Sequence, residues 1–410
     1  MRALTWQGKR KVSVETVPDP SIQEPTDAVV RITSTALCGS DLHLYEVMGP
    51  FLDPGDVLGH EPMGIVEEVG SGVTHIRPGD RVVVPFNISC GSCATCSTGL
   101  QSQCETTQNH ETPIGGFGAS LFGYTKLYGQ VPGGQAEYLR VPQAHYGPIK
   151  VPEGVPDDRY LYLSDVLPTA WQAVAYAGVG QGPTSSRQHG SRVGSLVVLG
   201  LGPIGDMCAR IAAHLGVEEV IGIDPVAERR ARVEAHLGGA VRTIDPQATD
   251  DLVGAVRDLT GGRGADAVID AVGMEAHGSP VAKAAHTALG FVPDAVAQKM
   301  MATTGVDRLS ALHTAVDLVR RGGTISLSGV YGGAADPMPM LYMFDRQVQL
   351  RMGQANVHRW VPDILPLLTD ADPLGVDTFA THRVPLEQAA EAYEQFQEKR
   401  DGTVKVVFTP

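Results

Sequence analysis

The second half of the chain alternates short apolar runs with amphipathic stretches. The stretches between the runs, such as PIGDMCARIAAHLG at 203–216, have the spacing of helices with one buried face. Continuous apolar strands that alternate with helices are typical of a parallel sheet covered on both faces. This half is therefore predicted to form a doubly wound α/β domain of the Rossmann type. The expected strands cover residues 195–200, 219–224, 240–245, 266–273, 323–330 and 348–353.

The first half contains short β-like runs separated by many Gly and Pro turns, with little helical periodicity. Examples are KVSVETVP, DAVVRITSTALCG, GHEPMGIVEEVGSGV and GDRVVVPF. They predict a compact β-barrel with loops, and the segment GTVKVVF near the C-terminus is expected to return to that barrel as a strand. We therefore expect a first domain at 1–166, a second domain at 167–352 and a C-terminal return to the first domain at 353–410.

Length and charge narrow the class of protein. A chain of 410 residues with 43% hydrophobic residues can form two domains. The formal net charge of −14, without a long Lys/Arg block, argues against nucleic acid or an anionic membrane as partner, because both need dense positive charge. No window approaches about 18 uninterrupted apolar residues, and the first residues lack a signal-peptide pattern. We expect a cytoplasmic enzyme with a small-molecule substrate.

Four cysteines crowd into the segment CGSCATCSTGLQSQC, at Cys90, Cys93, Cys96 and Cys104. Thiols stay reduced in the cytoplasm, so disulfides are not expected. The spacing lets a tight loop direct four thiolates at one centre about 2.3 Å away. Iron–sulfur clusters use related spacings but not this one, and four unrelated free cysteines are the other alternative. Because four thiolates leave no open coordination position, we predict a structural zinc lobe and look for the chemistry elsewhere.

The segment GLGPIG follows the first predicted strand of the α/β domain and opens a helix. In that context the second glycine lets a pyrophosphate approach the backbone, and the helix N-terminus supplies the positive end of a dipole. A Gly-rich turn without a ligand is the alternative interpretation. The predicted dinucleotide contacts are Gly200, Gly202, Pro203, Ile204 and Gly205.

Asp224 ends the next predicted strand, 24 positions after Gly200. A carboxylate there can accept hydrogen bonds from the adenosine ribose hydroxyls, whereas the 2′-phosphate of NADP would meet a like charge. NAD is therefore the predicted cofactor. Arg229 and Arg230 keep NADP open, because an arginine near this site can hold a phosphate.

Two further segments carry candidate chemistry. CGSDLH places Cys38, Ser40 and His43 together, and GHE places His60 and Glu61 after another strand. Cys and His ligands from separate loops, with coordination positions left open, are typical of a catalytic zinc site. Taken alone, Cys38 could be an inert buried thiol and His60 a loop histidine with a structural partner.

Together, CGSDLH, GHEPMGIVEEVG, the four-cysteine segment, GGQAEYLRVP and GLGPIG resemble the zinc-dependent medium-chain alcohol dehydrogenases over essentially the whole chain. That family combines a GroES-like catalytic domain with a Rossmann domain. Within it, VPFNISCGSC, LSDVLPTAW and DAVGMEAHG resemble the branch of bacterial glutathione-independent formaldehyde dehydrogenases.

The resemblance implies that Cys38 and His60 ligate a catalytic zinc, and that Glu61 can move toward the metal during ligand exchange. Many relatives use a second cysteine as the third protein ligand, but the matching stretch here is LSDVLPT, which puts Asp165 in that place. An oxygen ligand donates less charge than a thiolate, so the zinc should be a stronger Lewis acid. The alternative is that Asp165 only caps a helix ahead of Pro168.

The resemblance also implies a reaction. Zinc lowers the pKa of the substrate hydroxyl, and Ser40 accepts the proton. The nicotinamide ribose passes it on to His43, which is expected close to solvent and whose ordinary pKa suits that role. Hydride moves from the substrate carbon to the nicotinamide, and an aldehyde reacts as its hydrate.

Further contacts rest mainly on the resemblance. Val272, Ser328 and Val330 are expected at the carboxyl ends of sheet strands, near the nicotinamide half. Phe86 matches a wall of the substrate pocket, with ordinary core as the alternative. The remaining implied cofactor contacts are Arg229, His277, Gly353 and Gln354.

Several alternatives stay open at this level. The substrate is formaldehyde, a small primary alcohol, or a secondary alcohol or polyol; tightly held NAD would make the enzyme an aldehyde dismutase. A zinc-free reductase would lack Cys38, His60 and the cysteine lobe, and a non-catalytic scaffold would have lost one of these groups. We expect two zinc ions and NAD per subunit, and a homo-oligomer, a tetramer rather than a dimer. A polar loop at 181–192 and an insertion at 274–306 have no assigned role.

Overall fold

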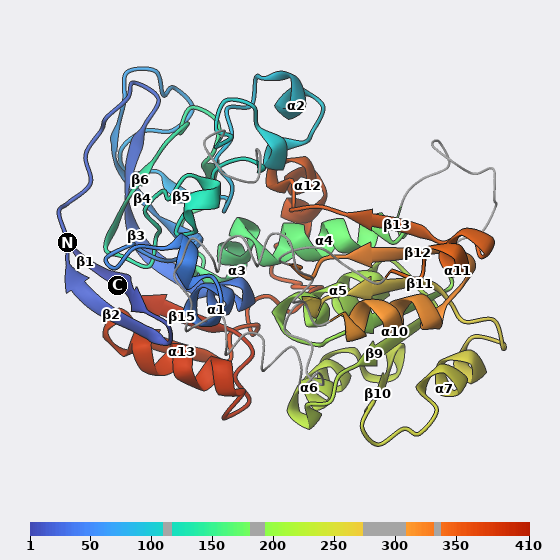
Figure 1. The fold of residues 1–410 in the computed structure, drawn as a ribbon. Coiled ribbons are helices and arrows are strands. Elements are labelled where there is room, and N and C mark those ends of the chain that lie inside the picture. Colours follow the sequence, from blue (N-terminus) through green and yellow to red (C-terminus); the bar gives the residue numbers. More distant parts are fainter. Residues whose placement is uncertain (110–116, 181–192, 274–308, 332–337) are drawn as a thin grey trace. The chain divides into compact units, whose positions relative to one another are not determined.

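The computed structural model describes residues 1–109, 117–180, 193–273, 309–331 and 338–410 (Figure 1). The predicted loop at 181–192 and insertion at 274–306 lie outside these residues. The chain divides into two compact units, and the first is made from two separate stretches. The units are Met1–Pro168 with Ala355–Pro410, and Thr169–Gln354.

A seven-stranded sheet organises the first unit. The strand order is β14-β15-β3-β4-β5-β7, and β6 pairs with β3 outside this path. A separate antiparallel pair, β1 and β2, completes the strands of this unit. The bounds are β1 Arg2–Gly8, β2 Lys11–Thr16, β3 Ala28–Leu37, β4 Glu61–Val69, β5 Arg81–Val83, β6 Tyr138–Val141, β7 Ile149–Lys150, β14 His382–Pro385 and β15 Val406–Thr409.

The register of three strands places the chemistry-bearing segments side by side. Ala36 on β3 lies opposite Glu61 at the start of β4. Leu37, the last residue of β3, lies opposite Val406 on β15. The segment after β3, the segment before β4 and the segment before β15 therefore meet at one end of the sheet. β15, which lies within the segment GTVKVVF, pairs with β3 of this sheet.

Short helices connect these strands. The α-helices of this unit are α1 Gly39–Glu46, α2 Ala94–Ser97, α3 Asp158–Leu161, α12 Val357–Ile364 and α13 Ala389–Glu398. The helix α4, Val166–Tyr176, begins at the end of the first stretch and belongs mostly to the second unit. The 3-10 turns are η1 Gly49–Phe51, η2 Gln101–Gln103, η3 Lys126–Tyr128, η4 Tyr162–Ser164, η8 Leu365–Leu367 and η9 Leu386–Gln388.

The second unit is built on a six-stranded sheet in which every pair of neighbours is parallel. The order β10-β9-β8-β11-β12-β13 is that of a Rossmann sheet, because the first strand in sequence lies in the middle. The predicted α/β class is therefore confirmed. The bounds are β8 Ser195–Leu199, β9 Glu219–Ile223, β10 Val241–Ile244, β11 Ala265–Asp270, β12 Val319–Leu327 and β13 Gln349–Met352.

Helices follow the strands of this sheet, as the alternating pattern predicts (Figure 1). The core lies between sheet and helices, where Val197, Ile221, Val268 and Ile325 from four strands pack with Leu312 of α10. Burial of such aliphatic side chains is the main favourable term in folding. The helices are α5 Pro203–His214, α6 Ala227–Leu237, α7 Leu252–Leu259, α10 Ser310–Leu318 and α11 Met340–Asp345, with the 3-10 turn η6 Gly238–Ala240.

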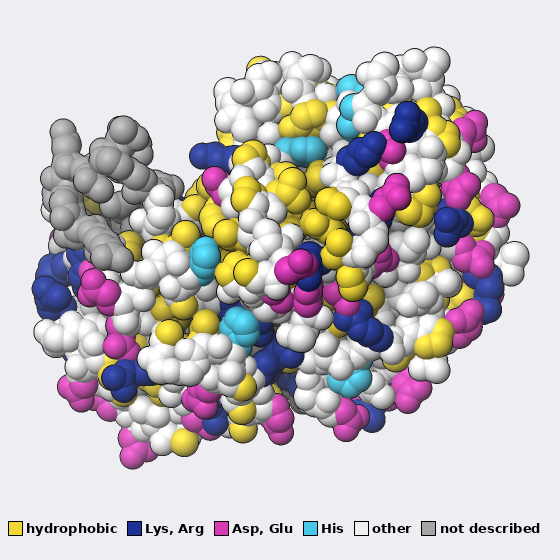
Figure 2. All heavy atoms as spheres, turned by 180° about the vertical axis from the view of Figure 1, so that it is seen from behind, with side chains coloured by type: hydrophobic (Ala, Val, Ile, Leu, Met, Phe, Trp, Pro, Cys, Tyr) yellow, Lys and Arg dark blue, Asp and Glu magenta, His cyan; other side chains and the backbone are white. Residues whose placement is uncertain are grey.

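Charges of both signs are mixed on one face of the molecule (Figure 2). On the face in Figure 2, Lys and Arg side chains lie among Asp and Glu side chains. Such a distribution differs from the dense basic stripe that binds nucleic acid. Among the described residues, none of the helices combines the length and apolar character needed to cross a bilayer.

Candidate metal centres and cofactor site

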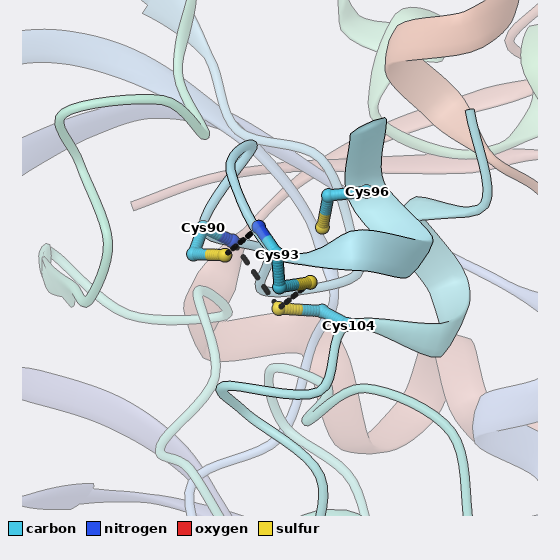
Figure 3. Close-up of side chains that lie close together, drawn as sticks. All are labelled: Cys90, Cys93, Cys96 and Cys104. Carbon is cyan, nitrogen blue, oxygen red and sulfur yellow. Dashed lines mark hydrogen bonds between the residues drawn. The ribbon is translucent and has the colours of Figure 1, made fainter. Parts of the chain in front are cut away.

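The four cysteines of the predicted lobe lie together in the first unit. One ligand atom from each of Cys90, Cys93, Cys96 and Cys104 lies within 4.8 Å of the others, and all four thiols are free (Figure 3). The sulfurs of Cys93 and Cys104 are 3.9 Å apart. Bonds of about 2.3 Å to one central ion place tetrahedral ligands roughly 3.8 Å apart, whereas a disulfide needs about 2.05 Å. The donor set and its spacing fit a zinc ion.

Hydrogen bonds lower the pKa of two of these cysteines, which favours the thiolate form that binds a metal. The backbone N–H of Cys93 donates to Cys90 Sγ at 3.3 Å, and Thr106 Oγ1 lies 3.2 Å from the same sulfur. Burial alone raises the pKa of the Cys90 thiol, yet hydrogen bonds from Thr106 and Ser92 lower it to about 5. The pKa of Cys93 is lowered to about 7 in the same way. Because the thiolate is the metal ligand, these two sulfurs can bind zinc near neutral pH, whereas burial raises the pKa of Cys96, whose proton a metal ion has to displace.

A second buried group of potential ligands lies at the end of the seven-stranded sheet. One ligand atom from each of Cys38, His60, Glu61 and Asp165 lies within 4.8 Å of the others. Asp165 Oδ2 is 3.4 Å from Cys38 Sγ and 3.4 Å from His60 Nε2. The three predicted ligands therefore converge. A thiolate, an imidazole and a carboxylate leave one tetrahedral position open, which is typical of catalytic zinc.

Local structure explains why three distant segments converge here. Cys38 follows β3 directly and is the N-cap of α1, so the strand end fixes its position. His60 precedes β4, which pairs with β3. Asp165 follows η4 and precedes α4. Asp165 is therefore the residue directly before a helix, as the capping alternative requires. Its carboxylate also contacts the other two candidate ligands.

Asp41 is a functional residue that the sequence interpretation missed. Its Oδ1 lies 3.1 Å from His60 Nδ1, and its Oδ2 accepts a hydrogen bond from the Cys38 backbone N–H at 3.0 Å. Gln135 donates to Asp41 Oδ2 at 3.3 Å, and Tyr393 donates to Gln135 Oε1 at 2.8 Å. A carboxylate on the far nitrogen of a ligating histidine fixes its tautomer and orientation. Asp41 could have been identified from the sequence, because it lies in the same segment, CGSDLH, as the candidate ligand Cys38.

Lys405 is the second residue that was missed. Both carboxylate oxygens of Glu61 lie 2.6 Å from Lys405 Nζ, and both side chains are fully buried. The amine also donates to the Leu37 carbonyl at 3.1 Å. Glu61 therefore lies close enough to the other candidate ligands to bind a metal, but a lysine holds both of its oxygens.

The buried titratable groups at this site shift one another's pKa values. Burial, followed by the negative charges of Asp165 and Glu61, raises the pKa of the Cys38 thiol to about 11. Burial disfavours the imidazolium of His60, but the carboxylates of Asp41 and Asp165 outweigh it and raise its pKa well above the ordinary value. Both groups hold protons that a metal ion has to displace when it binds.

Two residues of the expected proton path also lie in α1. Ser40 Oγ is 3.2 Å from His60 Nε2, so the serine contacts the candidate metal centre. His43 was expected close to solvent, and this is wrong: its side chain is only 8% exposed. The reason is that α1 buries five consecutive residues and presents no open face at these positions. Phe86 packs its ring edge-on to His60, with centroids 6.4 Å apart.

The predicted dinucleotide loop follows β8 and opens α5, with Gly202 as N-cap and Pro203 as the first helical residue. A Cβ at Gly205 would lie 1.7 Å from the Gly200 carbonyl oxygen, so the fold itself requires glycine there. At Gly202 the nearest atom to such a Cβ is 3.5 Å away, on Arg229. The protein leaves room for a side chain at Gly202. Because the protein itself does not require glycine at this position, we interpret the missing side chain as space for a ligand that approaches the backbone. The N–H groups at the start of α5 are suited to bind a pyrophosphate.

Asp224 follows β9 and is buried beside this loop. Its Oδ2 accepts a hydrogen bond from the Leu201 backbone N–H, and its Oδ1 accepts one from Val226, both at 2.7 Å. The carboxylate thus ties the loop to the strand that follows.

The two nearby arginines differ in their partners. Arg229 Nη1 lies 3.8 Å from Asp224 Oδ2. Arg230 donates to the Asp224 carbonyl at 2.6 Å and pairs with Asp245 at 3.0 Å. Arg230 is therefore engaged by backbone and carboxylate groups, while Arg229 lies next to the loop.

The remaining expected contacts lie at the carboxyl edge of the parallel sheet. Val272 follows β11, and Ser328 follows β12 and donates its backbone N–H to the Asp270 carbonyl at 3.0 Å. Val330 is 46% exposed. Gly353 and Gln354 follow β13, and both carbonyls accept hydrogen bonds from Gln172 Nε2 at 3.0 and 2.9 Å. His277 lies outside the described residues.

Comparisons with known protein families find a matching family model in each of the two units. The family model of the alcohol dehydrogenase GroES-like domain matches residues 24–153, and that of the zinc-binding dehydrogenases matches residues 203–289. The first match contains Cys38, His60 and the four cysteines of the lobe, and the second begins at Pro203 of the predicted dinucleotide loop.

Individual relatives match over the full length. The chain is 38% identical to an uncharacterized zinc-type alcohol dehydrogenase-like protein, AdhB, of Bacillus subtilis, over 100% of both chains. It is 30% identical to a formaldehyde dismutase of Pseudomonas putida, over 100% of this chain and 97% of the relative. The solved structure of alcohol dehydrogenase TADH from Thermus sp. ATN1 superposes with a TM-score of 0.78 at 31% identity, covering 100% and 99% of the two chains. The chain therefore belongs to the zinc-dependent medium-chain alcohol dehydrogenase family.

Proposed function

We propose that the protein is a zinc- and NAD-dependent dehydrogenase that interconverts an alcohol, or an aldehyde hydrate, and its carbonyl product. The observation that carries this proposal is the convergence of Cys38, His60 and Asp165 within a few ångströms, from three separate segments of the chain. A zinc ion held by these residues would supply the Lewis acid that polarises the substrate oxygen. The cysteine lobe would hold a second, structural ion.

The roles of the chain's own groups follow from their positions. Cys38 and Asp165 supply two negative charges, which balance a divalent cation in a buried site. Ser40, which contacts His60 Nε2 at 3.2 Å, is placed to accept the proton of a substrate hydroxyl at its Oγ. His43 lies in the same helix, is buried, and would serve as a further proton acceptor.

NAD is the cofactor we propose. The carboxylate of Asp224 lies at the end of β9, where a ribose hydroxyl could bind and a 2′-phosphate would meet a like charge. Arg230 supports the same choice, because its guanidinium is bound to the Asp224 carbonyl and to Asp245. Arg229 remains the group that could favour NADP.

Formaldehyde is the substrate we propose to test first. The formaldehyde dismutase of Pseudomonas putida is similar over the whole chain, and the motif LSDVLPT supplies an oxygen ligand in the form of Asp165. Secondary alcohols and polyols are the second candidates. A dismutase would use NAD that it does not release.

Self-association is part of the proposal. The helix α11 exposes large apolar side chains, with Met340 64%, Leu341 75% and Phe344 79% exposed. Exposed apolar clusters of this kind are typical of protein interfaces. Light scattering during gel filtration would give the number of subunits.

The test is a metal and nucleotide census of the purified protein by mass spectrometry, followed by activity with formaldehyde and a panel of alcohols. We expect two zinc ions per chain and NAD reduction. Asp165→Asn should lose one zinc ion and reduce kcat/KM by at least about 100-fold. Asp165→Cys, which restores the ligand of many relatives, should keep both ions. Full activity and two zinc ions in Asp165→Asn would disprove the ligand assignment.

A further inference from the structure

The Lys405–Glu61 pair lies directly beside the candidate catalytic centre, and none of the roles proposed above uses the lysine. Lys405 is fully buried, and its Nζ lies 2.6 Å from both oxygens of Glu61. Burying a charged lysine destabilises the folded state unless the charge is paired. A buried lysine at this position therefore calls for a functional explanation.

The pair matters because Glu61 is itself a potential metal ligand. One of its carboxylate oxygens lies within 4.8 Å of the ligand atoms of Cys38, His60 and Asp165. If Glu61 stayed bound to the ion, four protein ligands would close the tetrahedron and leave no position for substrate, so any movement of Glu61 toward the metal has to be reversible. A closed shell of four protein ligands is the mark of a structural site, not of a catalytic one.

Charge balance favours keeping the glutamate with the lysine. A divalent zinc ion is neutralised by the Cys38 thiolate and the Asp165 carboxylate, and Glu61 is neutralised by Lys405. Without the lysine, a fully buried carboxylate would face a divalent cation at short range, with no other compensating charge in hydrogen-bond contact among the described residues. It would then be drawn into coordination.

Backbone hydrogen bonds fix the position of Lys405. Lys405 directly precedes β15, its N–H donates to Thr381 Oγ1 at 3.0 Å, and its carbonyl accepts from the Thr381 N–H at 2.8 Å. Its Nζ also donates to the carbonyl of Leu37, the residue before Cys38, at 3.1 Å. One side chain thus restrains both Glu61 and the end of β3.

We propose that Lys405 is a positioning residue that holds the Glu61 carboxylate outside the coordination shell and so keeps one position on the catalytic metal open. The inference rests on the proposed metal site at Cys38, His60 and Asp165. It assigns to Lys405 no contact with substrate and no proton transfer.

The test uses the full-length protein in which zinc is exchanged for Co²⁺, because the visible spectrum of cobalt reports coordination geometry. Imidazole serves as the probe of an open position, since the four-cysteine lobe has none. In Lys405→Met we expect the imidazole-induced spectral change to disappear, the metal to be retained at least as well as in wild type, and kcat to fall on the order of 100-fold as the site closes.

Three variants separate positioning from a merely structural role. Lys405→Met/Glu61→Gln, which removes both charges, should respond to imidazole again. Lys405→Arg, which keeps a cation on Glu61, should resemble wild type. Lys150→Met, at an exposed lysine of the same unit, is the control and should change nothing.

The outcomes are distinct. If Lys405→Met keeps the wild-type imidazole response, or if the double variant does not recover it, the inference is wrong. If Lys405→Met does not fold, Lys405→Gln, which keeps a donor but no charge, decides by the same criterion. If the wild-type protein itself gives no imidazole-sensitive cobalt spectrum, the proposed function fails rather than the role of Lys405.

Discussion

Asp41 Oδ1 lies 3.1 Å from His60 Nδ1, whereas the other ring nitrogen, Nε2, lies 3.4 Å from Asp165 Oδ2. The histidine therefore has one nitrogen directed at the candidate metal centre and the other at a fully buried carboxylate. Such a carboxylate increases the basicity of the ligand and fixes its tautomer. The metal centre extends in this way beyond the residues that would touch the ion.

Asp41→Asn should weaken metal binding at this centre by about 10- to 100-fold, because the amide cannot supply the negative charge that Nδ1–H faces. Competition with a chelator, followed by zinc analysis, would measure the change. Asp53→Asn, at an exposed carboxylate of the same unit, is the matched control. Unchanged zinc affinity in Asp41→Asn would contradict the proposed role.

Cys104→Ser should remove the lobe's ion and leave the other in place. The Cys104 side chain is fully buried and accepts the Cys90 N–H at 3.3 Å, so the weaker serine ligand opens the lobe. A loss of about 3 kcal/mol would lower the Tm of a domain of this size by roughly 6–12 °C. Zinc analysis and calorimetry would check both effects.

The control for this change is Cys208→Ser, at a buried cysteine of α5 in the other unit. It replaces the same atom and should leave the zinc content unchanged. Loss of both zinc ions in Cys104→Ser would show that the lobe does not act as a separate site.

Asp224→Ser should shift cofactor preference toward NADP. Removing the carboxylate takes away the ribose contact and the charge that repels a 2′-phosphate, and it leaves Arg229 close to the loop. We expect kcat/KM for NAD to fall by roughly 10-fold, which corresponds to about 1.4 kcal/mol, and kcat/KM for NADP to rise.

Steady-state kinetics with both cofactors would measure the shift, with a thermal melt to detect disturbance of the loop that Asp224 holds. Asp258→Asn, at an exposed carboxylate of the same unit, is the control. Equal losses for both cofactors would argue that Asp224 supports only the loop.

His358 predicts a loss of stability in acid. Burial lowers the pKa of this histidine to about 4, while its Nε2 lies 2.8 Å from the Gly147 carbonyl and its ring lies against Tyr146 at an interplanar angle of 36°. An unfolded histidine titrates near pH 6.5, so between about pH 6.5 and 4 the unfolded chain takes up a proton that the folded chain does not. Stability therefore falls as the pH drops through this window and is unaffected above it.

The full difference between the two pKa values corresponds to on the order of 3 kcal/mol, and partial exposure of the ring reduces it to about 2 kcal/mol. His358→Gln should thus lose less stability than wild type between pH 7 and 4, measured by denaturant unfolding. His214→Gln, at an exposed histidine, is the control. Parallel curves for His358→Gln and wild type would rule out the effect.

The sequence was most informative where spacing along the chain determines the chemistry. The cysteine lobe and the glycine loop are local, so their residue types and intervals could be recognised directly. The strand prediction was less exact: the predicted strand at 323–330 begins at Val319 and ends at Leu327. The early start depends on pairing of Val319 with Ala265, which no local pattern contains.

Interactions between distant segments could not be predicted. Lys405 and Glu61 are 344 residues apart, and only the pairing of β15 with β3 and of β3 with β4 brings them together. The burial of His43 likewise depends on what packs around α1. Asp41 is the exception, because it lies three residues after Cys38 and a carboxylate partner for a ligating histidine could have been sought there.

The split composition of the first unit has a consequence for synthesis on the ribosome. β15 lies between β14 and β3, and the Lys405–Leu37 contact joins residues 368 positions apart. The whole Rossmann unit, Thr169–Gln354, is translated before β15 exists. Domains generally fold as units during translation, so the nucleotide-binding unit can complete its sheet while the catalytic sheet still lacks a strand. The contacts of Lys405 with Glu61 and Leu37 therefore form only after the Rossmann unit has been translated, so the surroundings of the candidate metal centre are completed later than the parallel sheet.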